Sequence, residues 1–312
     1  MTGRTPDAAT PGRADGARAD GARADGGTLY VVSTPIGNLG DITHRALEVL
    51  GAVSRIAAED TRITRRLLER YGIATRTTSY HARSGPSRER ELLDHLASGA
   101  DLALVTDAGT PVVSDPGDGL VAAWAAAGGR VVPVPGPSSV LAAVAGSGVA
   151  GPRWSFEGFL PRSGRERRER IAGIAADPRG SVVFEAPGRL ASTLRDLAAA
   201  CGVDRPGAVC RELTKLHETI TRGPLGELAI AAADGTIPSR GEMVIVVGWR
   251  SGPGSDESAA AEDALAAARA AVQALVAAGT ARGEAARRVA QETGLPRRSL
   301  YGADDASERQ LR

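Results

Sequence analysis

The stretch "DLALVTDAGTPVVSDPGDG" (101–119) contains one complete strand–loop–helix unit of the fold that the sequence predicts. Residues 101–106 form an apolar run of strand length, and an Ala-rich helical stretch begins at residue 118. The loop between them is rich in glycine, proline and aspartate, so its backbone amides can approach a bound group closely. It lacks the Gly-Lys-Ser/Thr ending of a Walker loop, and we therefore expect a ligand other than a nucleoside triphosphate.

The same alternation of strand and helix surrounds this stretch. Further strands are predicted at 29–33, 55–59 and 130–134, and helices at 43–51, 61–71, 87–98 and 118–127. Strands that alternate with helices in this way are typical of βαβ units and a parallel sheet. We therefore predict an α/β fold whose N-terminal domain, residues 28–148, is doubly wound.

Three more segments complete the predicted organisation. Residues 1–27 contain the repeat "RADGARADGARADGG", which has only alanine as apolar residue, so this tail is expected to be disordered. A second α/β domain is predicted over 149–250, with strands at 181–186, 207–213 and 242–248. Residues 251–312 are predicted to form a linker and a small C-terminal helical domain with the cadence of a helix-turn-helix.

Composition limits the class of protein. The chain has 312 residues, 42% of them hydrophobic, and a net charge of +1, which excludes a grossly basic nucleic-acid-binding protein. No apolar run approaches the roughly 18 to 20 residues of a membrane helix, and we expect a cytoplasmic protein. No metal is predicted, because metal-ligand spacing is absent among the cysteines and histidines: Cys201, Cys210, His44, His81, His95 and His217.

Four loops follow the strands of the predicted N-terminal sheet. They are "STPIGNLGD" (33–41), "EDTR" (59–62), the stretch quoted above and "VPGPSS" (134–139). In open parallel sheets ligands bind beyond the carboxyl ends of the strands. Each loop combines glycine or proline with hydroxyl or carboxylate groups, so together they predict a binding pocket at one edge of the sheet.

In this order, and with "FEGFLPR", "RELTKLHETI" and "GEMVIVV" further on, the motifs resemble those of the ribosomal RNA small subunit methyltransferase I family, of the tetrapyrrole methylase superfamily. The resemblance covers residues 28–250. It implies two α/β domains that hold S-adenosylmethionine between them. It also implies methyl transfer to the ribose 2′-hydroxyl of a cytidine in the decoding centre of 16S rRNA, the small ribosomal subunit as partner, and a homodimer.

We assign the cofactor-binding residues from these loops. Small residues allow close backbone approach, and the hydroxyl and carboxylate groups accept or donate hydrogen bonds. Two positions in the second domain are expected to close the site. The assigned residues are Pro35, Gly37, Asp107, Gly109, Thr110, Val113, Gly136, Ser138 and Ser139, with Glu212 and Met243 from the second domain.

A ribose hydroxyl is a poor nucleophile near neutral pH, so catalysis needs a base or a charge that stabilises the alkoxide. Glu59 or Asp60, at the end of a strand, is predicted to be the base. Lys215 is the only lysine among 38 basic residues and is predicted to steady the alkoxide or an RNA phosphate. The alternative is that these charges pair with one another, and the single lysine also fits chance in an Arg-biased composition.

RNA contacts are predicted at exposed arginines. Arg62 follows the second strand, and residues 153–170 carry six arginines against three glutamates, among them Arg162 and Arg165. Arg297 and Arg298 lie in the C-terminal helical segment. The alternative for these residues is a solvated helix face. Two rival functions stay open: a superfamily methyltransferase acting on a tetrapyrrole or a protein side chain, and a helix-turn-helix regulator whose α/β body senses a ligand.

Overall fold

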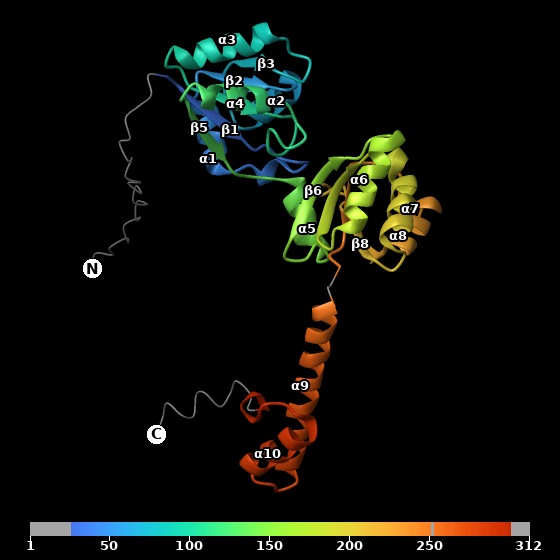
Figure 1. Ribbon diagram of the computed structural model, residues 1–312. Coiled ribbons are helices and arrows are strands. Elements are labelled where there is room, and N and C mark those ends of the chain that lie inside the picture. The colour runs from blue at the N-terminus through green and yellow to red at the C-terminus, as the bar shows by residue number, and fades with distance from the viewer. Residues whose placement is uncertain (1–25, 251–252, 301–312) are drawn as a thin grey trace, which may run out of the picture. The chain divides into compact units, whose positions relative to one another are not determined.

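The computed structural model describes residues 26–250 and 253–300 (Figure 1), so the predicted tail lies almost wholly outside the described residues, as do the last residues of the chain. By its internal contacts the chain divides into two compact units. The first unit is Met1–Ala143 with Arg211–Thr219, and the second is Val144–Cys210 with Ile220–Arg312. The short segment Arg211–Thr219 thus belongs to the first unit, although strands of the second sheet flank it in the sequence.

The first unit contains a five-stranded parallel sheet in the order β3-β2-β4-β1-β5. The central strand, β4, pairs parallel with β1, which is far from it in the sequence. Because the two strands are parallel neighbours, the loops that follow them lie side by side. The predicted α/β fold with a parallel sheet is confirmed. The strands are β1 (Thr28–Val32), β2 (Arg55–Ala58), β3 (Thr77–Ser79), β4 (Leu102–Val105) and β5 (Arg130–Val134).

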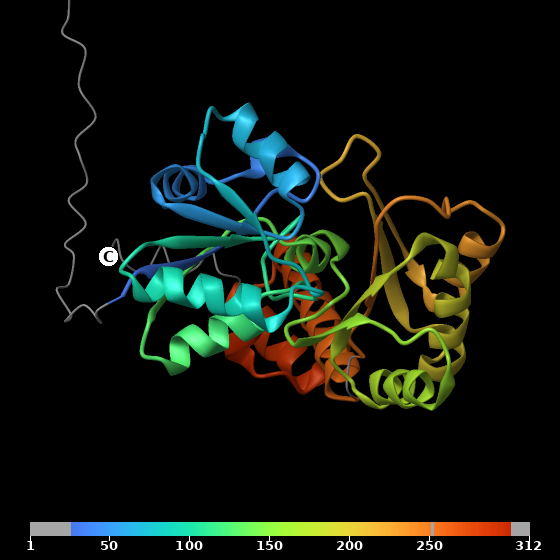
Figure 2. The same cartoon turned by 90° about the horizontal axis from the view of Figure 1, so that it is seen from above.

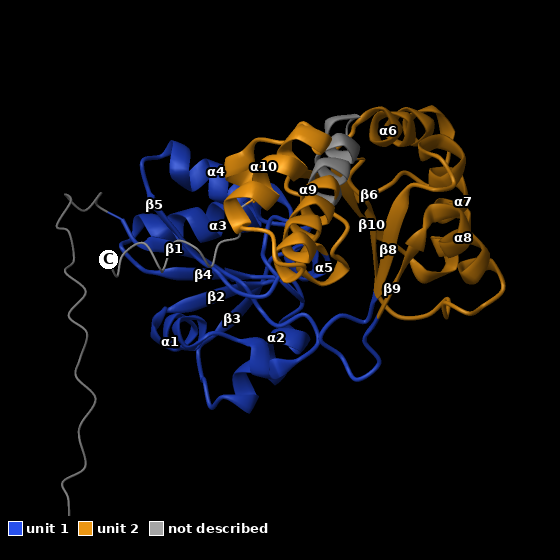
Figure 3. Cartoon of the chain, turned by 90° about the horizontal axis from the view of Figure 1, so that it is seen from below, with its two compact units in different colours: residues 1–143, 211–219 blue, residues 144–210, 220–312 orange. Residues whose placement is uncertain are grey.

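Helices cover both faces of this sheet, α1 and α2 on one face and α3 and α4 on the other (Figure 3). Two hydrophobic clusters result, one around Leu50 and Leu68 and the other around Leu92 and Trp124. Every residue of β4 is fully buried, which explains its uninterrupted apolar run. The helices are α1 (His44–Ala52), α2 (Thr61–Arg70), α3 (Pro86–Ala97) and α4 (Asp118–Ala126), with η1 (Leu39–Asp41) before α1 and α5 (Ser139–Ser147) leading into the second unit.

The second unit contains a mixed sheet in the order β6-β7-β10-β8-β9. Strand β7 pairs parallel with β6 and antiparallel with β10. The second predicted α/β domain is therefore confirmed. The strands are β6 (Trp154–Phe159), β7 (Gly180–Glu185), β8 (Pro206–Arg211), β9 (Thr219–Pro224) and β10 (Met243–Val247).

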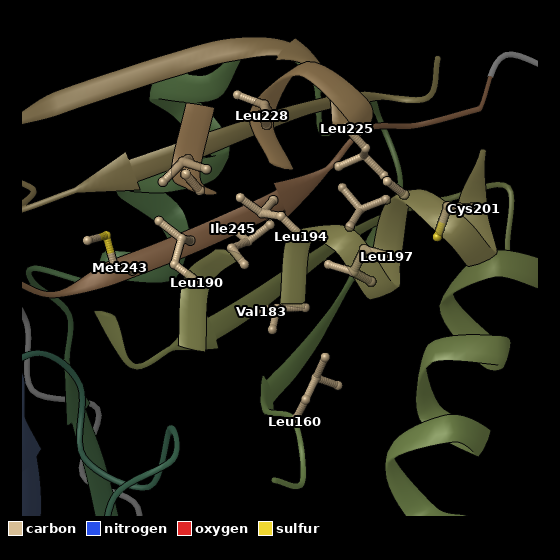
Figure 4. Packing of buried hydrophobic residues seen from close by; sticks show 14 of the residues in the cluster. Leu160, Val183, Leu190, Leu194, Leu197, Cys201, Leu225, Leu228, Met243 and Ile245 are labelled. Carbon is tan, nitrogen blue, oxygen red and sulfur yellow. The ribbon is translucent and has the colours of Figure 1, made fainter. Parts of the chain in front are cut away.

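Three helices lie along one face of this second sheet (Figure 2). The core between them is apolar, with Leu190, Leu194 and Leu197 from one helix packed against Val183 and Ile245 from the strands (Figure 4). Both cysteines are buried and form no disulfide. The helices are α6 (Gly164–Ala176), α7 (Leu190–Cys201), preceded by η2 (Pro187–Arg189), and α8 (Leu225–Ala233).

The C-terminal segment forms α9 (Pro253–Ala277), α10 (Arg282–Thr293) and the 3-10 turn η3 (Arg297–Leu300). A small cluster that includes Val272, Val289 and Leu300 joins them. The second helix of the predicted helix-turn-helix is therefore a single 3-10 turn. None of the described helices combines the length and the apolar composition of a membrane-spanning segment.

Candidate active site

The loops after β1 and β4 are bonded backbone to backbone. The Thr34 amide donates to the Gly109 carbonyl at 2.8 Å, and the Gly109 amide donates to the Thr34 carbonyl at 3.0 Å. The hydroxyl oxygens of Ser33 and Thr110 lie 2.9 Å apart. Gly109 has a φ of +81°, which side chains other than glycine rarely adopt. The two loops thus form one fixed wall at the carboxyl edge of the sheet.

The loop after β5 joins the same wall. The Thr110 hydroxyl donates to the Pro137 carbonyl at 3.3 Å. A Cβ atom at Gly136 would lie 3.0 Å from the Cβ of Ser33, so a larger residue would force the loops apart. The structure therefore brings together the predicted residues Gly109, Thr110 and Gly136, and it adds Ser33. Sequence reasoning quoted Ser33 in its loop without assigning it a role.

Hydrogen bonds to carboxylate groups connect the loop after β2 to the loop after β4. The Asp60 amide donates to Asp107 Oδ1 at 2.9 Å, and the Asp107 amide donates to Glu59 Oε2 at 3.3 Å. Burial raises the pKa of the Asp107 carboxyl, although the hydrogen bond from the Asp60 amide opposes that rise. Three of the four predicted loops, those after β1, β2 and β4, thus lie against one another through named contacts, and Thr110 links them to the fourth.

Asp60 is engaged locally. It is the N-cap of α2, and its Oδ1 accepts from the Arg62 amide at 2.8 Å. The Arg62 guanidinium donates to both of its carboxylate oxygens, with Nη2 to Oδ2 at 2.5 Å. These hydrogen bonds hold the pKa of Asp60 well below its usual range. A carboxylate with so low a proton affinity is a poor base, so between the two predicted candidates the geometry favours Glu59.

A third carboxyl group, Asp115, was missed by sequence reasoning. It is half-buried, and burial, with repulsion from Glu59 and Asp107, raises its pKa to about 6. The turn before it is strained, since Val112 and Ser114 have φ angles of +76° and +64°. The "SDPG" sequence indicates only a turn. The pKa of Asp115 depends on burial and on the carboxylates of Asp107 and Glu59, which lie 8 and 56 positions before it in the chain.

Replacing Asp115 with asparagine is expected to stabilise the protein above pH 6. In the wild type the folded state keeps its proton up to about pH 6, whereas the unfolded chain releases it near 3.8, so stability falls between those values and stays low above them. The rise in the pKa of Asp115 from 3.8 to about 6 corresponds to at most about 3 kcal/mol of unfolding free energy. Solvent screening at a half-buried group reduces this to about 1 to 2 kcal/mol. Urea unfolding of both proteins from pH 4 to pH 8 measures the difference.

The matched control is Asp94→Asn, at an exposed position of α3. The difference in unfolding free energy between this variant and the wild type should stay nearly constant over the same pH range. If the gap between wild type and Asp115→Asn does not widen from pH 4 to pH 6, Asp115 is not held in its protonated form by the fold.

Lys215 lies against the loop after β1. Its ammonium pairs with Glu212 at 2.9 Å, and its side chain is 26% exposed. A Cβ atom at Gly37 would lie 2.4 Å from Lys215 Cγ, so the lysine stem covers this glycine, whose φ is +149°. Glu212 and Thr214 have φ angles of +52° and +68°. The structure thus brings Lys215, Glu212 and Gly37 together within the first unit, in a strained segment of the kind that often serves function.

The other predicted residues are placed as follows. Pro35 is buried, Val113 is half-buried, and the Ser138 hydroxyl accepts from the Leu141 amide at 3.4 Å, one turn into the helix that Ser139 begins. Met243 is 3% exposed within the core of the second unit. The roles of these residues stay predictions. Among the described residues, no group of three or more His, Cys, Asp or Glu side chains could hold a metal ion.

The predicted RNA-contacting arginines do not lie together in one unit. Arg62 is 85% exposed in the first unit. Arg162 is exposed in the second unit, as is Arg165, which pairs with Glu169. In the C-terminal segment both arginines are exposed, and Arg297 donates to the Gly283 carbonyl at 3.0 Å. Their RNA contacts also stay predictions: Arg62, Arg162, Arg165, Arg297 and Arg298.

The comparisons with known proteins agree on the family to which the chain is similar. The family described as Tetrapyrrole (Corrin/Porphyrin) Methylases matches residues 28–229. The ribosomal RNA small subunit methyltransferase I of Synechocystis sp. is 45% identical over 275 residues, which are 88% of this chain and 96% of that relative. The protein of the same name from Micromonospora olivasterospora is 45% identical over 276 residues, 88% of this chain and 85% of its own.

Solved structures share the fold at lower identity. Cobalt precorrin-4 methyltransferase has a TM-score of 0.53 and 18% identity, and it covers 71% of this chain and 95% of its own. Uroporphyrin-III C-methyltransferase from Thermus thermophilus, complexed with S-adenyl homocysteine, has a TM-score of 0.51 and 20% identity over 71% and 97%. The chain therefore belongs to the ribosomal RNA small subunit methyltransferase I family, within the tetrapyrrole methylases.

Proposed function

We propose that this chain transfers the methyl group of S-adenosylmethionine to the ribose 2′-hydroxyl of a cytidine in 16S rRNA, within the small ribosomal subunit. The observation that carries the proposal is the 45% identity over 88% of the chain to proteins named as small-subunit rRNA methyltransferases. The choice of a cytidine and of its 2′-oxygen as the methylated atom rests on the family resemblance of the loops after β1, β2, β4 and β5.

The wall of the first unit fits this cofactor chemically. S-adenosylmethionine carries an ammonium and ribose hydroxyls, which need acceptors, and a carboxylate and an adenine, which need donors. Asp107 offers a carboxylate, and the hydroxyls of Ser33 and Thr110 can serve either way. Gly109 and Gly136 let the loops pack without intruding side chains. When bound, the cofactor supplies an electrophilic methyl group.

The protein's own residues then act on the ribose hydroxyl. Glu59 takes the proton, because its carboxylate lies at the strand edge beside Asp107 while Asp60 is bound to Arg62. Lys215 holds its positive charge near the loop after β1 and steadies the forming alkoxide or the neighbouring phosphate. Asp115 shares the same acidic surroundings, and burial with repulsion from Glu59 and Asp107 raises its pKa to about 6.

The rival functions are less well supported. Solved methyltransferases of tetrapyrrole substrates share the fold at 18 to 20% identity, whereas the relatives at about 45% identity are named for rRNA. A DNA regulator would need a recognition helix. In this chain that position holds only η3, a turn of four residues from Arg297 to Leu300.

The test is mass spectrometry of 16S rRNA from cells that lack the gene. One ribose-methylated cytidine should be absent and should return with the wild-type gene. Survival of every ribose methyl mark would disprove the proposed substrate. Isothermal titration of the purified protein with S-adenosylmethionine provides the separate test of the cofactor, and a titration without heat at several temperatures would count against it.

A further inference from the structure

All three phenylalanines of the chain lie together in the second unit. The ring centroid of Phe184 is 4.9 Å from that of Phe156 and 5.5 Å from that of Phe159, with interplanar angles of 68° and 62°. Such edge-to-face contacts are favourable and orient the rings. We refer to these three residues as the phenylalanine cluster.

An irregularity in β6 brings two of these rings to one face of the sheet. Phe156 pairs with Val182 and Phe159 pairs with Phe184, so three steps along β6 match two steps along β7. In a regular strand, positions three apart point to opposite faces. The extra residue corrects this, and Gly158 within the bulge has a φ of +60°, which glycine adopts readily. The backbone is therefore shaped to place Phe159 beside Phe184.

The Phe159 ring is presented to the outside of the unit. Its residue is 56% exposed, whereas the next residue, Leu160, is 1% exposed and belongs to the core under the helices. Phe159 thus lies on the face opposite α6, α7 and α8. An exposed aromatic ring held by a second ring offers a flat apolar surface on which a nucleic-acid base can stack.

The chain leaving Phe159 is also held in place. The Leu160 carbonyl accepts from Arg189 Nη2 at 2.8 Å, and the Pro161 carbonyl accepts from Arg167 Nη1 at 3.1 Å. Arg189 is in turn paired with the buried carboxylate of Glu185 at 3.2 Å. Little conformational freedom is therefore lost when a partner binds here, which favours affinity.

Positive charge accompanies the cluster along the chain. Of the six arginines in residues 153–170, three pair with carboxylates: Arg165, Arg167 and Arg170. The other three are exposed: Arg153, Arg162 and Arg168. Arg165 is exposed as well. Arg153 precedes β6 and Arg162 follows it, so exposed guanidinium groups lie at both ends of the strand that carries Phe159. Exposed arginines at both ends of a strand are suited to phosphates of one RNA chain.

We propose that the phenylalanine cluster and Arg162 form a contact surface for unpaired RNA, in which a base stacks on Phe159 and a neighbouring phosphate binds Arg162. The choice of RNA as partner rests on the proposed function. Contact with a second copy of this chain would need only the exposed apolar ring. The flanking arginines instead match RNA, in which flat bases alternate with negatively charged phosphates. This contact would bind the segment that carries the target nucleotide while leaving cofactor binding unaffected.

The experiment measures the Kd of the full chain for a short labelled single-stranded RNA and for a duplex of the same sequence. Phe159→Ala should weaken single-strand binding about tenfold and leave duplex binding nearly unchanged, and Phe159→Trp should retain single-strand binding. Arg162→Gln should weaken both and lower the slope of log Kd against log salt by about 0.7 to 0.9, the loss of one phosphate contact. Ile230→Ala, at a 66% exposed position of α8, is the matched control and should change nothing.

Wild-type RNA binding by Phe159→Ala overturns the proposal. If the sedimentation coefficient of that variant also changes, the cluster is assigned instead to contact between copies of the chain. Titration with S-adenosylmethionine should be the same for all variants. If the gene deletion leaves rRNA methylation intact while Phe159→Ala still loses RNA, the surface stands and only the proposed substrate fails.

Discussion

Lys215→Met is expected to lower kcat, at saturating S-adenosylmethionine and small-subunit rRNA, by about 10²- to 10³-fold. Methionine keeps an unbranched apolar stem over Gly37 but removes the ammonium that pairs with Glu212. The loss therefore reports charge rather than packing. Single-turnover methylation measured with radiolabelled cofactor gives the rate of the chemical step.

Three further variants sharpen this test. Lys215→Arg keeps the charge but replaces a compact ammonium with a planar fork, so partial activity is expected. Asp60→Asn should reduce turnover far less than Glu59→Gln, because Asp60 is bound to Arg62. Wild-type turnover in both Lys215→Met and Glu59→Gln would remove these two residues from the mechanism.

Glu185→Ala is expected to have the largest effect on stability, a loss of about 3 kcal/mol from the second unit. The Glu185 side chain is fully buried, accepts from the Thr193 hydroxyl at 2.6 Å and from the Ala186 amide at 2.8 Å, and pairs with Arg189. Its removal leaves those donors without their acceptor and Arg189 without its counter-charge, and each such loss destabilises the folded state.

Urea unfolding followed by circular dichroism measures this effect as a lower midpoint of the transition that belongs to the second unit. The matched control is Glu169→Ala, which removes the same side chain from an exposed ion pair with Arg165 and should change stability by about 0.5 kcal/mol or less. Equal midpoints for Glu185→Ala and Glu169→Ala would show that burial of this carboxylate contributes nothing.

The sequence predicted the first sheet well because its strands are apolar runs. β4 is buried on both faces, and its residues "LALV" carry the full signal of a central strand. β3, "TTS", and β9, "TITRGP", are short or polar and sit at edges of their sheets, so no apolar run marks them. β6 was hidden for another reason: its residues were grouped with the arginines that follow it in the predicted RNA-contacting stretch.

The candidate site was predictable as a set of loops but not as a set of interactions. Gly109, Thr110 and Gly136 follow from the rule that ligands bind beyond the carboxyl ends of parallel strands. The low pKa of Asp60 could not be read from "EDTR", because it depends on the rotamer of Arg62. The high pKa of Asp115 depends on burial, on Glu59 from the loop after β2 and on Asp107 from its own loop, and only the folded chain brings these groups near.

The segment Arg211–Thr219 limits how this protein can be divided. It is encoded between two strands of the second sheet, yet it folds with the first unit and carries the lysine that covers Gly37. A fragment ending at residue 143 would contain every strand of the first sheet and still lack Lys215 and Glu212. Exchange of the first unit between relatives must therefore carry two separate pieces of sequence, and a recombination point placed between the domains would pair the loop after β1 with a foreign lysine segment.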